Sequence, residues 1–236
     1  GFPGPREGGM HCRPPDVSAP RMGHGLGATV LAVAIGCLGL ARAIARTWEP
    51  TFCGERPVPA ARSLSLGAPF RGRLVGAKRF SDSPAARVLP RRHRPRCIRW
   101  GTGRLIAALQ AAGAAVQGAF PGSPPLGVGD LSRARGGSIA PYSHSHQSGR
   151  DADLAFYLLD EREMPVEPDD FDRMLPWGPD LRGVRERAHR FDAARTWALV
   201  AALLADARIE VRFVLISEPL RLAMLAQARR RRASRA

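Results

Sequence analysis

Residues 143–157 read SHSHQSGRDADLAFY, a run that holds two histidines, two aspartates and a glycine before it becomes apolar. Imidazole and carboxylate groups are nitrogen and oxygen ligands that a divalent metal such as zinc accepts. His146 and Asp153 are separated by a segment that contains Gly149, so the chain can turn and bring both side chains to one point. The pattern predicts a metal site at His146 and Asp153.

Asp151 belongs to the same pattern, since it alternates with Asp153 and both would project from one face of a strand. A polar surface loop is the alternative, because histidine beside serine and glycine is common in such loops. Only two good ligands are local, and zinc takes at least three protein ligands. The residues alone leave both interpretations open.

Three pieces of sequence occur in a fixed order around this run: GDLS at 129–132, a glycine pair at 136–137, and HQSGRDAD at 146–153. Their order and spacing resemble the signature of penicillin-insensitive murein endopeptidases, zinc peptidases related to lysostaphin, D-Ala-D-Ala carboxypeptidases and the hedgehog signalling domain. The resemblance extends from about Gly67 to about Ala228. It implies Zn²⁺ as cofactor and hydrolysis of D-alanyl-diaminopimelate peptide cross-links in peptidoglycan.

The resemblance also implies roles for single side chains in the run. His146 and Asp153 would be the first two zinc ligands, and Gln147 and Asp151 would orient them. His144 is next to the position where many relatives have another histidine.

A glycine-rich loop at 133–142 would border the substrate cleft of such an enzyme. Gly136 and Gly137 allow the backbone to approach a bound peptide closely, although two glycines also fit an ordinary turn.

The sequence departs from the family near its C-terminus. These peptidases take a third zinc ligand and a catalytic histidine from a late His-x-His motif, and no histidine follows His189 here. His189 has no spaced partner, so we expect it to be structural. No catalytic residue is identifiable, and we expect an incomplete fold that lacks the last strand and is inactive or weak. The alternative is a non-catalytic peptidoglycan-binding protein derived from this fold.

The first 43 residues are typical of an export leader. Arg21 precedes an apolar run at 28–40, which is short for a membrane span and suits the core of a secretory signal. Cleavage after Ala43 would release a periplasmic protein. Lipid attachment at Cys37 or an uncleaved anchor are the alternatives, and they are the only membrane contacts that we expect.

Export affects the interpretation of the mature chain, predicted as an irregular N-terminus at 44–66 and an endopeptidase-like domain at 67–236. This mature chain holds two cysteines, Cys53 and Cys97. Two cysteines in an oxidising compartment most simply form one disulfide, although two buried thiols are the alternative.

The formal net charge is +15, and Lys78 is the only lysine, so the basic charge is almost wholly arginine. A basic surface favours anionic partners in general. No helix-turn-helix, zinc-finger or aromatic-basic pattern occurs, which argues against nucleic acid as a partner.

Hydrophobic periodicity and turn residues predict the remaining elements. The segment 67–77 is expected to form a turn followed by a short strand, and further strands are expected at 86–89, 126–131, 154–159 and 209–216. Helices are expected at 103–117, at 191–206 and from Glu218. We expect loops at 91–96, with His93 exposed, and at 160–190. This order predicts one α+β domain, a mostly antiparallel sheet with flanking helices, and the resemblance implies a hedgehog/D-Ala-D-Ala metallopeptidase-like fold.

Overall fold

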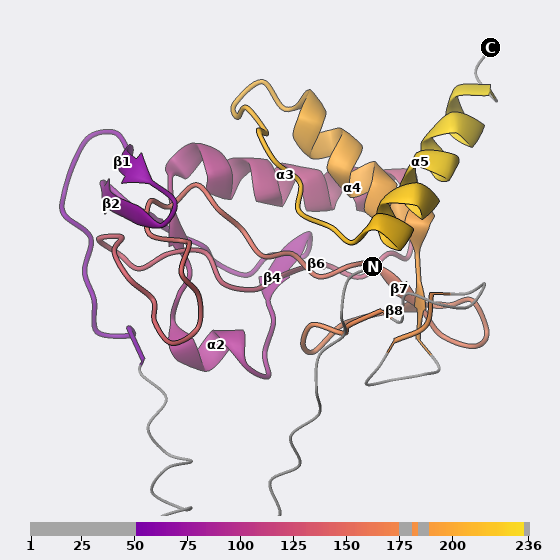
Figure 1. Cartoon of the computed structure of the whole chain (residues 1–236), viewed down its shortest axis with the longest axis horizontal. Coiled ribbons are helices and arrows are strands. Elements are labelled where there is room, and N and C mark those ends of the chain that lie inside the picture. The colour runs from indigo at the N-terminus through magenta and orange to yellow at the C-terminus, as the bar shows by residue number, and fades with distance from the viewer. Residues whose placement is uncertain (1–50, 175–180, 184–188, 234–236) are drawn as a thin grey trace, which may run out of the picture. The chain divides into compact units, whose positions relative to one another are not determined.

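The structure is a computed structural model that describes residues 51–174, 181–183 and 189–233 (Figure 1). The predicted leader at 1–43 and the first part of the predicted mature N-terminus lie outside these residues. None of the helices among these residues combines the length and the apolar character that a membrane span requires.

An antiparallel hairpin of β1 (Leu64–Ala68) and β2 (Arg71–Val75) comes first, where a turn and a short strand were expected. Gly67 at the end of β1 adopts a φ of +76°, and a Cβ there would lie 2.4 Å from a backbone oxygen of β2. Only glycine fits such a close approach. An isolated bridge between Arg73 and Gly136 ties the hairpin to the glycine-rich loop.

The main core forms around β4 (Ala86–Val88) and β6 (Leu126–Val128), which pair in parallel. Parallel strands need a long crossover, and this one contains α3 (Gly103–Ala119). The Thr102 hydroxyl caps α3 by accepting the N–H of Leu105 at 3.3 Å. Apolar side chains from the helix and both strands are buried together: Val88, Leu105, Leu109, Val116, Leu126 and Val128.

The basic segment between these elements is not a loop. It forms a short helix, α2 (His93–Arg96), between β3 (Lys78–Arg79) and β5 (Trp100–Gly101), which pair antiparallel. His93 is 6% exposed, so the expectation of an exposed His93 is wrong. Its burial depends on carboxylates that are distant in the sequence, as described below.

The C-terminal part holds a small antiparallel sheet of order β8–β7–β9 and two helices. These elements are β7 (Leu158–Leu159), β8 (Pro165–Val166), β9 (Arg190–Phe191), α4 (Ala193–Ala205) and α5 (Glu218–Ala233). The Asp192 carboxylate caps α4 by accepting two backbone N–H groups at 3.0 Å. α4 packs against both α3 and α5 (Figure 1).

Two strand predictions differ from the structure. The expected strand at 154–159 is reduced to a bridge at Leu154 and the two residues of β7. The expected strand at 209–216 does not form, and Phe213 and Leu215 are 84% and 93% exposed. A strand needs a neighbouring edge for its backbone hydrogen bonds, and no described segment pairs with 209–216.

The described chain is therefore a mixed α+β structure with helices beside its strands. Its strand pairs are antiparallel except for β4 and β6, but they form several small sheets instead of one continuous sheet. Cys53 and Cys97 are joined in a disulfide, the pair predicted from the cysteine count, with a Cα–Cα distance of 4.9 Å. The bond closes a 44-residue separation and holds the segment before the hairpin against α2.

Candidate functional site

The structure brings His146 and Asp153 together. The His146 Nε2 lies 3.2 Å from the Asp153 Oδ1. Backbone hydrogen bonds place Asp153 beside the end of β6, since its carbonyl accepts the N–H of Gly129 at 2.8 Å and its N–H donates to the Asp130 carbonyl at 3.1 Å. The His146 side chain is buried, whereas that of Asp153 is 45% exposed. A buried imidazole thus meets a carboxylate that solvent can reach.

The turn between these two residues depends on left-handed backbone conformations. His146 has a φ of +66° and Gly149 a φ of +72°. A Cβ at Gly149 would lie 2.5 Å from a methyl group of Leu74, so the chain can reverse here only with glycine. The strained conformation of His146 is held by Asp151, whose Oδ2 accepts the His146 backbone N–H at 3.1 Å.

Three carboxylates favour positive charge at the His146 imidazole. Burial alone lowers the pKa of His146, but the hydrogen bond to Asp153 and the negative charges of Asp153, Asp151 and Asp130 outweigh it and raise this pKa. The position therefore suits a cation, whether a proton or a metal ion.

Two polar atoms at the same place have no hydrogen-bond partner in the described part of the chain: His146 Nδ1 and Asp151 Oδ1, both buried. Leaving such atoms unpaired costs about 1–3 kcal/mol each. Nitrogen and carboxylate oxygen are the donors that zinc accepts, so His146 Nε2 and Asp153 Oδ1 fit two corners of a zinc site. Across the described residues, no group of three or more His, Cys, Asp or Glu side chains could hold a metal ion.

The neighbours of the pair have separate places. His144 is exposed, and its backbone carbonyl accepts the side-chain N–H of Gln147 at 3.2 Å. Gln147 thus stabilises the loop instead of contacting the pair. The structure does not bring His144 to the pair, and His189 lines a different cavity, of about 310 Å³, beside Asp169.

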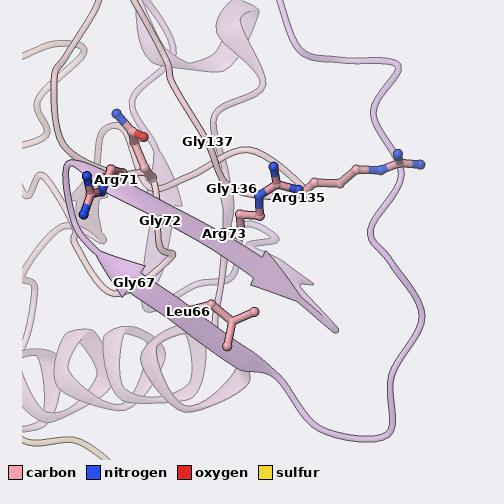
Figure 2. Close-up of a pocket in the computed structure, with 9 residues that line it drawn as sticks. Leu66, Gly67, Arg71, Gly72, Arg73, Arg135, Gly136 and Gly137 are labelled. Carbon is pink, nitrogen blue, oxygen red and sulfur yellow. The ribbon is translucent and has the colours of Figure 1, made fainter.

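A groove of about 530 Å³ adjoins the motif (Figure 2). Gly136, Gly137 and Gln147, which were predicted for the cleft or its surroundings, all line it. The remaining lining residues come from the hairpin and the loop: Leu66, Gly67, Arg71, Gly72, Arg73 and Arg135. His146 and Asp153 do not line the groove, but Gln147 directly follows His146 and connects the two features.

A model of the penicillin-insensitive murein endopeptidase family matches residues 65–230, well over half of the chain. The chain belongs to this family. The match begins in β1, ends in α5, and includes the His146–Asp153 pair and the groove. No curated protein matches the sequence. Membership in the murein endopeptidase family identifies the chain with hydrolytic enzymes whose substrate is peptidoglycan.

This murein endopeptidase family member also has a buried charged cluster that was not predicted from the sequence. The Asp130 carboxylate, 4% exposed, lies 2.9 Å from His93 Nδ1 and accepts an N–H of Arg96 at 3.0 Å. His93 Nε2 faces Asp170 at 3.6 Å, and Phe171 packs edge-on against its ring. The signal in the sequence was a single carboxylate, Asp130, inside the apolar run at 126–131, where a buried charge needs a partner.

Proposed function

We propose that this family member is a zinc metalloendopeptidase of the peptidoglycan cross-link, with His146 and Asp153 as two of its zinc ligands. The observation that carries the proposal is the 3.2 Å approach of His146 Nε2 and Asp153 Oδ1 beside the groove. The family match supports peptidoglycan as the substrate. The D-alanyl-diaminopimelate bond is the cross-link that we propose as the target.

In this proposal Asp153 and Asp151 have different roles. Asp153 is half-exposed and can meet a ligand from solvent, while Asp151 fixes the backbone of His146 and with it the direction of the imidazole. Zinc held there supplies a Lewis acid that polarises the scissile carbonyl and lowers the pKa of a water molecule. The groove beside Gln147 provides room for the peptide.

Two protein ligands are fewer than zinc enzymes use. No histidine follows His189 in this sequence, so we propose that the chain binds zinc weakly and cleaves cross-links slowly or not at all. We also propose that the chain has a hedgehog/D-Ala-D-Ala metallopeptidase-like fold and that it is located in the periplasm.

The test is muropeptide release from purified peptidoglycan in the presence of zinc, measured by chromatography. The chain is compared with a version that carries an added C-terminal strand with a His-x-His pair. Only the extended version should release cross-link products, and His146→Ala or Asp153→Ala in that version should abolish release. His144→Ala is the matched control and should leave release unchanged. Release that survives both changes overturns the proposal.

A second candidate is a peptidoglycan-binding protein without hydrolytic activity. It is favoured because His146 and Asp153 do not line the groove, so the groove can hold a peptide without any metal. Retention on insoluble peptidoglycan by both versions, without product release by either, would select this candidate.

A further inference from the structure

The groove beside the motif is strongly basic. Three arginines, Arg71, Arg73 and Arg135, are among its lining residues, and none of the lining residues is acidic. Figure 2 shows Arg71 at the start of β2, Arg73 further along the same strand, and Arg135 on the neighbouring loop segment beside Gly136. The bridge between Arg73 and Gly136 brings Arg135 to this place from the glycine-rich loop.

These guanidinium groups are available for a ligand. Within the described residues, Arg71 and Arg73 have no side-chain hydrogen bond or ion pair, and Arg135 uses its Nε to donate to the Arg56 carbonyl at 3.1 Å. Arginines elsewhere on the same domain do have carboxylate partners, such as Arg195 with Asp192 at 2.6 Å. An arginine fork that faces a groove without a carboxylate can bind one from a ligand.

The floor of the groove is rigid backbone. A Cβ on Gly136 would lie 2.3 Å from the Gln147 carbonyl oxygen, and a Cβ on Gly72 would lie 2.6 Å from the Ser148 Cβ. The Gly137 N–H donates to the carbonyls of Gly72 at 3.1 Å and Gln147 at 2.9 Å. A side chain does not fit at Gly72 or Gly136, so the backbone there is packed tightly and holds the strand and loop that carry the arginines.

The spacing of the arginines matches an extended peptide. Arg71 and Arg73 are alternate residues of one strand, so their Cα atoms are about 7 Å apart. Same-side groups of an extended peptide repeat at about this distance. The arrangement therefore suits a strand that carries two carboxylates. Two contacts connect the groove to the metal motif. Gln147, which lines the groove, directly follows His146, and Arg150 of the motif donates to the carbonyl of Gly67 in the groove at 2.6 Å.

We propose that Arg71, Arg73 and Arg135 form a subsite for free carboxylates of the substrate peptide, which positions the cross-link beside His146 and Asp153. This inference rests on the proposed function, because it assumes a peptidoglycan peptide as the ligand. The ligand class is an anionic peptide with at least two carboxylates, and diaminopimelate, a dicarboxylic amino acid, is one source of them.

The test is fluorescence anisotropy of the full chain with a labelled, diaminopimelate-containing cross-linked peptide dimer, in the presence of a chelator so that hydrolysis does not interfere. The double variant Arg71→Gln/Arg73→Gln should bind the dimer at least about tenfold more weakly, since the loss of one charged hydrogen bond is enough for about a tenfold change in affinity. Arg229→Gln is the matched control, an exposed arginine of α5 outside the groove, and should bind like the unaltered chain.

A second probe with its carboxylates amidated should bind the unaltered chain as weakly as the double variant binds the acid. Equal binding of the acid by the double variant and Arg229→Gln, or equal binding of both probes, overturns the subsite. Because no metal is present, this result is independent of the muropeptide-release test. Arginine-dependent binding, without zinc-dependent cleavage by the version with the added His-x-His strand, would contradict the metallopeptidase proposal alone. No binding of either probe would contradict the subsite alone.

Discussion

The imidazole of His93 lies 2.9 Å from the buried carboxylate of Asp130, although the two residues come from a basic helix and from the segment that follows β6. Arg96 is a second partner of the same carboxylate. Asp130 also pairs through its backbone with Asp153 and contributes to the negative potential at His146. The cluster thus fixes Asp130, which in turn positions Asp153 in the candidate site.

His93→Ala should destabilise the protein by about 2–4 kcal/mol, because it leaves the Asp130 carboxylate buried with one partner fewer. Urea unfolding measures the change. His144→Ala is the control, since His144 is exposed and its substitution should stay within about 0.5 kcal/mol of the original stability. Equal midpoints for the two variants would show that the buried contact does not stabilise the fold.

Gly136→Ala and Gly137→Ala form a matched pair in the groove floor. Both positions have a positive φ, +69° and +81°, so each alanine carries backbone strain of about 1–2 kcal/mol. At Gly136 the new Cβ also meets backbone atoms at 2.3 and 2.7 Å, whereas nothing lies within 4 Å at Gly137. Thermal unfolding should therefore show a clearly larger loss for Gly136→Ala. A larger loss for Gly137→Ala would contradict the described floor.

Asp82→Asn should reduce stability in a pH-dependent manner. Burial raises the pKa of Asp82, but hydrogen bonds from the Val88 N–H and from Arg94, together with the positive charges of Arg94 and Arg99, outweigh burial and lower it. A carboxyl with a lowered folded-state pKa stabilises the fold above its unfolded pKa, and this contribution disappears as the pH falls through the folded-state pKa.

The difference between Asp82→Asn and the original chain should therefore be largest near neutral pH and vanish at strongly acidic pH. Its size should stay below about 1 kcal/mol, because the Asp82–Arg94 pair is partly exposed to solvent. Denaturant titrations over a pH series measure it, and a difference that grows on acidification would contradict the assignment.

Asp151→Ala should weaken zinc binding by about 10- to 100-fold without removing a proposed ligand, because groups that orient metal ligands have effects of this size. The physical reason is the loss of the hydrogen bond that holds the His146 backbone at a φ of +66°. Competition with a chromophoric chelator measures the affinity. Ser143→Ala, in the same loop but outside this bond, is the control and should leave the affinity unchanged; an equal affinity for both variants would contradict the role of Asp151.

Features that depend on nearby residues were predicted from the sequence. The helix expected at 103–117 begins where α3 begins and ends within two residues of its observed end. Nearby residues bound it on both sides, since Thr102 caps its start and Pro121 follows its end closely. The approach of His146 and Asp153 could be anticipated because glycine permits a tight reversal between them.

Apart from the Cys53–Cys97 disulfide, the features that need a distant neighbour were not predicted. His93 has the sequence context of a surface loop, and only Asp130 and Asp170, far along the chain, make its burial possible. The segment 209–216 has strand-like residues but no partner edge in the described structure. The arginine groove exists only because the hairpin meets the glycine-rich loop.

The most direct test of the account is a zinc titration of the chain by calorimetry, with His146→Ala, Asp153→Ala and His144→Ala measured beside it. If His146 and Asp153 share one metal ion, each of their variants loses at least about tenfold in affinity, while His144→Ala binds like the unaltered chain. Identical isotherms for all four proteins would mean that the two side chains meet for a structural reason and not to hold zinc.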